Sequence, residues 1–278
     1  YLFTLLALIL MTNISASDIE KDLQTQFILA EPGDTIIIPE GLHDILGTLS
    51  IDGKQDLIIR GFGMDESILS FSGQVEGAQG ISITNSSNIT LEDFTVRDSK
   101  GDAIKTQYVD GIIFRGITVE WTGGPKPSNG AYGLYPVQCT NVLIEFCIAI
   151  GASDAGIYVG QSENIIVRNS RAEYNVAGIE IENSNYADVY NNLTTHNTGG
   201  ILIFDLPDLP KQGGHTIRVF DNRSVQNDTP NFAPEGNIVG EIPRGTGIIV
   251  MASKNVEIFN NEIGDNATVN LAVVAGED

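Results

Sequence analysis

The amino-acid sequence predicts an all-β solenoid, a parallel β-helix with about 22 to 23 residues in each coil. Three observations support this fold class. Segments of the chain align with one another at that period, and glycine and apolar positions recur in register along it. No helical periodicity lies between the short strand-like runs.

The repeat is clearest in three successive segments that align almost without gaps. They begin at Asn141 (NVLIEFCIAIGASDAGIYVGQS), at Asn164 (NIIVRNSRAEYNVAGIEIENS) and at Tyr186 (YADVYNNLTTHNTGGILIFDLP). Each alternates apolar and polar residues over short runs that Gly and Asn interrupt, which is typical of strands and turns. Because such a strand cannot bury its apolar face alone, we expect coils to stack in parallel, about 4.8 Å apart.

Two apolar rows and one amide row recur from coil to coil. The first apolar row pairs a small residue with an aliphatic one: Gly80-Ile81, Ala103-Ile104, Gly133-Leu134, Gly156-Ile157, Gly178-Ile179, Gly200-Ile201 and Gly247-Ile248. The second is Ile59, Leu91, Phe114, Ile144, Val167, Val189, Val219 and Ile258. The amide row is Asn169-Ser170, Asn191-Asn192, Asp221-Asn222 and Asn260-Asn261. We expect the stacked asparagines to bond to one another in the bends.

The pattern resembles the right-handed parallel β-helix of the pectin-lyase-like superfamily. AEPGDTIIIPEGLH (residues 30–43) matches the usual entry of those proteins, and the segment before it reads as a short amphipathic helix that caps the solenoid. More narrowly, YGLYPVQC, SDAGIYVGQS, AGIEIENS and TGGILIFDLP resemble a family of exported bacterial β-helix proteins. That resemblance implies an exported c-type cytochrome as a candidate partner.

The chain is expected to divide into three parts. Residues 1–16 (YLFTLLALILMTNISA) are apolar and uncharged, like a secretory signal peptide whose start is missing. Residues 17–29 form the capping helix, and residues 30–278 form the β-helix, with an end that also looks truncated. We therefore expect an exported protein, periplasmic or extracellular, with no membrane span after removal of the signal peptide.

Charge limits the classes of partner. Lys and Arg total 15 and Asp and Glu total 36, which gives a net charge of −21. This acidity disfavours nucleic acid and anionic membranes as partners. No cofactor is evident and no metal-type spacing of Cys and His appears, although Ca²⁺ could bridge the protein to an acidic polysaccharide. The two cysteines, Cys139 and Cys147, could pair in an exported protein, but Cys147 occupies a core position that suits a free thiol.

An outward-facing row accompanies the first apolar row. Since Ile157 and Val159 point inward, Tyr158 must point outward, and so must its equivalents. These are Ser82, Lys105, Tyr135, Glu180, Leu202 and Ile249; three residues further along lie Gln138, Gln161, Asn183 and Asp205. The two sets predict a polar, aromatic ribbon on which a sugar chain could lie. The alternative is purely structural, because stacked aromatics and amide ladders also stabilise sheets.

Two long insertions are expected to wall a shallow cleft beside this ribbon. Residues 122–133 and 226–247 both precede the Gly-Ile strand, whereas the connections in the three coils between them are short. The expected floor contains Asp154, Asn175 and His196. A third insertion, residues 205–216, leaves the opposite end of the strand. Long loops on a rigid solenoid commonly carry function, although Asp154 could instead close a turn.

The candidate catalytic residues are Tyr158, Glu180, Asp154 and His196. Candidates for substrate binding are Lys105, Tyr135, Gln138, Gln161, Asn183, Asp205 and Arg244. Lyases and epimerases that act on uronic acids need a base, an acid and a cation beside the carboxylate. Hydrolases need a pair of carboxyl groups, which Asp154, Glu180 and Asp205 could supply.

Two functions remain open at this stage. The first is an exported protein that binds or modifies a polysaccharide as a lyase, epimerase or hydrolase. The second is a non-catalytic scaffold that binds a protein such as the cytochrome. The sequence lacks the catalytic arginine and Asp-rich Ca²⁺ clusters of pectate lyases, the Asp-Pro-His-Asp run of alginate epimerases and the paired aspartates of polygalacturonases. Whether the protein is an enzyme is therefore undecided from the sequence.

Overall fold

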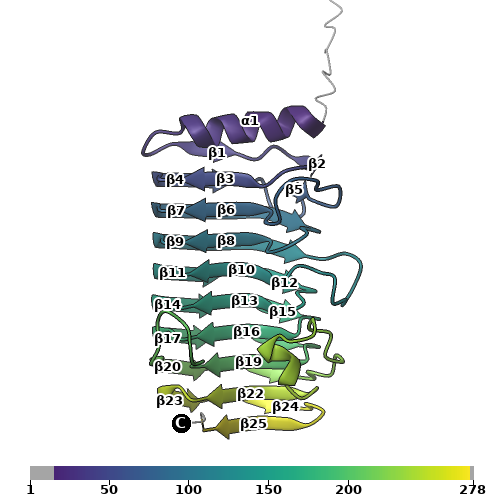
Figure 1. Cartoon of the computed structure of the whole chain (residues 1–278), viewed down its shortest axis with the longest axis vertical. Helices are drawn as coiled ribbons and strands as arrows, with labels where there is room; N and C mark the ends of the chain where they lie inside the picture. The colour runs from purple at the N-terminus through teal and green to yellow at the C-terminus, as the bar shows by residue number, and fades with distance from the viewer. Residues whose placement is uncertain (1–15, 276–278) are drawn as a thin grey trace, which may run out of the picture.

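The computed structural model describes residues 16–275 and shows stacked coils of parallel strands beneath one helix (Figure 1). The expected signal peptide lies almost wholly outside these residues. Helix α1 (Ala16–Leu29) lies across the first coil and buries Ile19, Leu23 and Phe27 against the core. Gln24 accepts a hydrogen bond from the Ser50 backbone N–H and donates one to its carbonyl. The helix therefore caps the solenoid, as expected.

Two parallel sheets run the length of the solenoid. We call the nine-stranded sheet B; its strands are β3 (Leu49–Asp52), β6 (Ile81–Thr84), β8 (Ile104–Gln107), β10 (Tyr132–Val137), β13 (Ala155–Gly160), β16 (Ala177–Glu182), β19 (Gly199–Phe204), β22 (Thr246–Met251) and β25 (Val269–Val274). Its neighbours follow one another in this order, so each coil contributes one strand.

The 16-stranded sheet, sheet A, bends into two faces. One face holds β1 (Thr35–Ile37), β4 (Gln55–Arg60), β7 (Ser87–Arg97), β9 (Asp110–Glu120), β11 (Thr140–Glu145), β14 (Glu163–Arg168), β17 (Asn185–Tyr190), β20 (His215–Phe220) and β23 (Lys254–Phe259). The other holds β2 (Gly41–Asp44), β5 (Ser67–Ser70), β12 (Ile148–Ile150), β15 (Arg171–Glu173), β18 (Leu193–Thr195), β21 (Arg223–Val225) and β24 (Glu262–Gly264), together with the ends of β7 and β9.

The predicted rows are confirmed as inward-facing stacks. Ile104, Leu134, Ile157 and Ile179 pair directly across β8, β10, β13 and β16, and all are fully buried. The small residue before each is required by the close approach of the next coil. A Cβ atom on Gly133 would lie 2.3 Å from a backbone carbonyl oxygen in the adjacent coil.

Asparagine ladders fill two of the bends, and the amide row predicted the first of them. Asn192 donates its side-chain N–H to Asn222, which donates in turn to Asn261, at 3.0 Å in both cases. A second ladder in the bend before sheet B joins Asn175 to Asn197 at 3.0 Å and continues along the axis. Both satisfy buried backbone groups that the turns leave without a strand partner.

An alternating ladder of arginine and glutamate runs along the outer side of sheet A. Arg60, Glu92, Arg115, Glu145 and Arg168 occupy equivalent positions in successive coils and form inter-coil ion pairs. Burial alone would raise the pKa of Glu145. Hydrogen bonds from Arg115 and Arg168 outweigh that effect and hold the pKa below its usual value. The ladder therefore favours correct coil register.

Cys139 and Cys147 are both free and buried, so the disulfide considered above does not form. The Sγ atom of Cys147 lies 3.3 Å from the carbonyl oxygen of Glu145, in the interior. Burial raises the pKa of this thiol to about 12. It therefore packs as a small apolar side chain. Among residues 16–275, no helix combines the length and apolar character that crossing a membrane requires.

Phe146 lies at a corner of the coil where the backbone has a left-handed conformation that favours asparagine. Its φ is +56°, its side chain is 54% exposed, and the equivalent corners of the next two coils hold Asn169 and Asn191. Asparagine tolerates this left-handed conformation better than a bulky residue does. We expect Phe146→Asn to stabilise the fold by about 1 kcal/mol, a rise in Tm of about 2 to 4 °C. Phe146→Ala, measured by the same thermal melt, should show no such gain; an equal gain would contradict the conformational explanation.

Candidate functional site

The outward-facing row of sheet B is only partly accessible. Lys105 on β8 and Tyr135 on β10 are half-buried, as a binding surface requires. From β13 onward the row is covered: Tyr158 is 4% exposed, Glu180 is 1% exposed and Leu202 is fully buried. The expectation of one continuous exposed ribbon is therefore wrong for its second half.

The insertion at residues 226–247 explains this difference. It folds over sheet B as a cover instead of standing beside it as a wall, and it contains a short 3₁₀ helix, η1 (Ile238–Glu241) (Figure 1). We call residues 231–243 the cover segment. Its Val239 and Ile242 are buried in an apolar cluster with Leu202, Phe204 and Ile249. Hydrophobic burial on this outer face could not be anticipated from the strand pattern alone.

Beneath the edge of the cover segment lie three carboxyl groups, which we call the carboxyl cluster: Asp154, Glu180 and Glu182. They are 6%, 1% and 7% exposed. The Tyr158 hydroxyl donates a 2.6 Å hydrogen bond to Glu182 Oε1, and Asn237 Nδ2 donates a 3.3 Å bond to Asp154 Oδ2. Glu180 Oε2 is buried and has no hydrogen-bond partner.

Burial raises the pKa of all three members of this cluster. It raises the pKa of Asp154 to about 7, with help from the charges of Glu182 and Asp102, while bonds from Tyr132 and Asn237 oppose the rise. Burial also raises the pKa of Glu180 well above its usual value, and the neighbouring carboxylates add to this. The pKa of Glu182 rises for the same reason, against the bond from Tyr158. A carboxyl group with a pKa of about 7, as Asp154 has, suits proton transfer at pH 7.

Three tyrosines surround the cluster. The ring centroid of Tyr132 lies 4.3 Å from that of Tyr135 and 4.6 Å from that of Tyr158. Burial raises the pKa of Tyr135 to about 12, and it raises the pKa values of Tyr132 and Tyr158 further. All three hydroxyls are therefore protonated near pH 7, so Tyr158 can donate hydrogen bonds but cannot serve as the base.

The accessible part of this face lies on β8 and β10, and we call it the open face: Asp102, Lys105, Tyr132 and Tyr135. Lys105 Nζ lies 5.1 Å from the ring centroid of Tyr135. Burial raises the pKa of Asp102, and the nearby Lys105 charge opposes that. The open face thus offers aromatic surface and hydrogen-bonding groups of both kinds.

The insertion at residues 122–133 borders the open face, as expected. The backbone N–H groups of Ser153 and Asp154 donate to the carbonyls of Gly130 and Ala131, each at 3.0 Å. These bonds tie the end of the insertion to the turn that carries Asp154. The insertion therefore positions both Tyr132, at the start of β10, and the Asp154 carboxyl group.

Other predicted floor residues lie elsewhere. Asn175 is fully buried in the asparagine ladder, so its placement on a cleft floor is wrong. His196 Nδ1 lies 3.0 Å from the Asp228 carboxylate, and its ring stacks on Tyr174. Arg244 Nε donates to the Asp228 carbonyl at 2.5 Å. Among residues 16–275, no hydrogen bond or ion pair joins His196 or Arg244 to the carboxyl cluster.

The corner row anchors loops instead of extending the ribbon. Asn183 donates to the carbonyls of Leu206 and Lys211, and Asp205 accepts bonds from the N–H groups of Gly213 and Gly214. Both therefore hold the insertion at residues 205–214. Gln138 accepts a 2.7 Å bond from Gln107 at the corner after β10. Gln161 occupies the next corner, with its Oε1 buried and without a partner.

Four site residues were missed from the sequence: Asp102, Tyr132, Glu182 and Asn237. Glu182 carried a usable signal, since it lies two residues after Glu180 and must share its face. The others enter through turns or through the cover segment, which no periodicity places. Across the part of the chain that the structure describes, no group of three or more His, Cys, Asp or Glu side chains is arranged to hold a metal ion. Ca²⁺ binding stays a prediction from composition.

Comparison with known proteins agrees with this architecture. The family model described as "right handed beta helix region" matches residues 60–208, more than half of the chain. Among curated proteins, no sequence relative matches.

Several solved structures share the fold at low sequence identity. The A-module of the mannuronan C-5 epimerase of Azotobacter vinelandii has a TM-score of 0.64 at 16% identity, covering 93% of this chain and 72% of that one. Endopolygalacturonase I from Stereum purpureum, with two bound galacturonates, has a TM-score of 0.54 at 15% identity, covering 95% and 96%. The tailspike of E. coli bacteriophage HK620, in complex with a pentasaccharide, has a TM-score of 0.54 at 14% identity, covering 95% and 63%. None of these descriptions mentions a cytochrome, so that expected partner gains no support from them.

Proposed function

The chain belongs to the right-handed β-helix family, and we propose that it binds a saccharide chain on the open face and cleaves it with the carboxyl cluster. The observation that carries this proposal is the position of Asp154. Its carboxyl group lies at the border between the open face and the cover segment, and its pKa is about 7. Buried ionisable groups cost several kcal/mol unless they are compensated, so their concentration on one outer face favours a functional site.

The residues divide into binding and chemical roles. Tyr135 and Tyr132 offer ring faces and hydroxyls to sugar rings, and Lys105 and Asp102 offer a donor and an acceptor to hydroxyl groups. The similar structures support a saccharide ligand, because two of them were solved with a bound sugar acid or pentasaccharide. The reaction itself rests on the carboxyl cluster of this chain.

Asp154 acts as the general acid. It donates its proton to the departing glycosidic oxygen as the bond from that oxygen to the anomeric carbon breaks. A water molecule attacks the anomeric carbon and passes a proton to Glu182. The hydrogen bond from Tyr158 stabilises the ionised form of Glu182, so that carboxylate can accept the proton. The remaining carboxyl group is Glu180, whose pKa is raised by burial, and in its protonated form it reduces the negative charge of the site.

A panel of hexamers of galacturonate, mannuronate and glucose tests the proposal. We expect one class to bind, and to release new reducing ends in the presence of the native protein near neutral pH. Calorimetry would measure binding, and chromatography would measure products. Neither binding nor product with any hexamer would exclude the proposed function.

Replacing the open-face aromatic ring gives a milder, local test. We expect Tyr135→Ala to weaken binding of the bound hexamer about 10-fold, because a stacked ring and its contact with Lys105 are lost. The Tm should change little, since Tyr135 is only half-buried. Tyr186→Ala, on the outer side of sheet A and 51% exposed, is the matched control and should bind like the native protein. Equal affinities for the two variants would remove the open face from the site.

A further inference from the structure

The outer face of sheet B changes character along the solenoid axis. Going from β6 to β25, the outward row reads Ser82, Lys105, Tyr135, Tyr158, Glu180, Leu202, Ile249 and Ala272. Its first three members are half-buried and the next four are buried. Polar side chains therefore stop at β16, where the cover segment crosses the face.

The cover segment is fixed at both ends and along its length. Just before it, Asp228 contacts His196, and the Thr229 N–H donates to the Asn197 carbonyl at 3.2 Å. Just after it, the Gly245 N–H donates to the Thr198 carbonyl at 2.9 Å. Asn231 bonds to the carbonyls of Val239 and Ile242 across the loop, each within 3.0 Å. These contacts hold the cover segment in a fixed position on the outer face of sheet B, where it blocks a bound chain.

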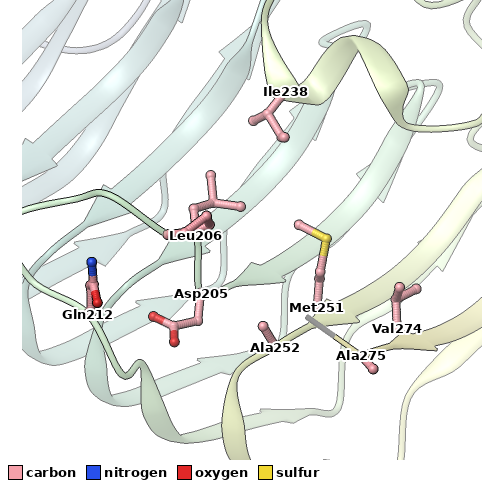
Figure 2. A pocket seen from close by; sticks show the side chains of 9 residues that line it. Asp205, Leu206, Gln212, Ile238, Met251, Ala252, Val274 and Ala275 are labelled. Carbon is pink, nitrogen blue, oxygen red and sulfur yellow. The ribbon is translucent and has the colours of Figure 1, made fainter. Parts of the chain in front are cut away.

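Beyond the cover segment the surface is largely apolar, and Asp205 and Gln212 are the polar side chains that line it (Figure 2). A cavity of about 550 Å³ lies between the insertion at residues 205–214 and η1, lined by Leu206, Ile238, Met251 and Val274 among others. A second cavity of about 320 Å³ shares Ile238, Met251 and Val274 and is lined mainly by aliphatic side chains. Asp205, the carboxylate at the edge of the first cavity, already accepts two backbone hydrogen bonds. The hydrogen-bonding row of the open face thus does not resume on this side.

We infer that the protein acts on the end of a saccharide chain and not at internal positions. This inference rests on the proposed function and deepens it by naming the form of the substrate. The terminal sugar lies against Tyr132 and Asp154, where the cover segment blocks any continuation. The rest of the chain runs over the open face toward β3. Three inter-strand steps separate β10 from β3, which leaves about 14 Å of face for it.

End-blocked substrates test this inference with the native protein. Each hexamer of the panel is prepared with a bulky fluorophore on its reducing end, on its non-reducing end, or on both. We expect one singly blocked form to be cleaved like the free hexamer, and the other two forms to react at least 10-fold more slowly. The free hexamer should lose one or two sugars at a time from one end.

The outcomes separate the two claims. Cleavage of the doubly blocked hexamer at the native rate, or internal fragments at the earliest time point, would overturn the chain-end inference while leaving the proposed function intact. No binding or cleavage of any free hexamer would exclude the proposed function, and the inference with it.

Replacing the loop tests whether the cover segment causes the preference for chain ends. In the coil at residues 174–178, the sequence Tyr-Asn-Val-Ala-Gly makes the same connection without an insertion. Asn175 and Asn227 belong to one ladder, and Ala177, Gly199 and Thr246 are in register. Replacing residues 228–245 by a single valine therefore restores the short connection. We expect this variant to cleave the doubly blocked hexamer at least 10-fold faster than the native protein does.

Two further variants accompany the loop replacement, one as a control and one for the case in which the deletion variant does not fold. Shortening residues 206–212, in the insertion at the other end of the strand, is the matched control and should preserve end specificity. If the deletion variant does not fold, Val239→Ser combined with Ile242→Ser loosens the cover segment without removing it, and should partly relax end specificity. A folded deletion variant that still rejects the doubly blocked hexamer would contradict the role of the cover segment.

Discussion

Asp154→Asn is expected to lower kcat on the cleaved hexamer by a factor of about 10² to 10⁴, the usual contribution of a general acid. Asparagine keeps the size of the side chain and can still contact Asn237, but it has no proton to give to the departing oxygen. Binding of the hexamer should be nearly unchanged, because the open face supplies the binding contacts. Initial rates and calorimetric affinities, measured on the same preparations, check both expectations.

The pH dependence identifies the same group. Asp154 must be protonated to act as the acid, and its pKa is about 7. Native activity should therefore fall as the pH rises through about 7, and the residual activity of Asp154→Asn should lack this limb. Asp188→Asn, which removes a half-buried carboxylate from an ion pair with Arg218 on sheet A, is the control and should behave like the native protein. Native-like rates for Asp154→Asn would assign the chemistry to another residue.

Glu180→Gln is expected to remove a pH-dependent loss of stability. Burial raises the pKa of Glu180 well above its usual value, so between those two values the folded state binds a proton that the unfolded state has released. Stability from such a group is fully present below the unfolded pKa, near 4.5, and is lost as the pH rises toward the folded pKa. The loss is about 1.4 kcal/mol per pH unit for each group.

The effect is large enough to measure by denaturant unfolding. Above the unfolded pKa the native protein should lose stability through Glu180 as the pH rises, at up to about 1.4 kcal/mol per pH unit until the folded pKa is reached. Glu180→Gln has no proton to exchange, so it should lose correspondingly less and be more stable than the native protein at pH 7.

Glu262→Gln is the matched control for this titration. Its carboxylate pairs with Arg223 on the surface, which lowers its pKa, so its contribution lies below the range from pH 5 to pH 7. The slope of stability against pH should therefore match that of the native protein. A Glu180→Gln slope that also equals the native one would show that Glu180 is ionised in the folded state.

The repeated parts of the fold could be predicted from the sequence because every coil buries equivalent residues in equivalent positions. Ile157 and Ile179 pair across neighbouring strands because each buries its aliphatic side chain against the equivalent side chain of the next coil. Asn192 and Asn222 stack because a buried turn needs the same amide each time. The N-terminal helix followed from its own periodicity and from the need to cover the first coil.

The site could be predicted only in part because it depends on what is not repeated. Alternation correctly placed Tyr158 and Glu180 on the outer face of sheet B, and the loop lengths predicted the candidate site beside them. Alternation gives direction but not exposure. Val239 and Ile242 lie in a loop without periodicity, and their burial on sheet B turned an expected open ribbon into a covered one. His196 and Arg244 both contact Asp228 at the base of that loop, and their catalytic and binding roles stay predictions.

The titration of the Asp154 carboxyl group tests the central claim most directly. Its side-chain carbon can be followed by ¹³C NMR from pH 4 to pH 9, with Asp154→Asn used to assign the resonance. We predict a midpoint near 7, because burial and the neighbouring carboxylates disfavour the charged form. A midpoint near 4, the usual value for an aspartate, would contradict the claim that this cluster holds the proton needed for chemistry.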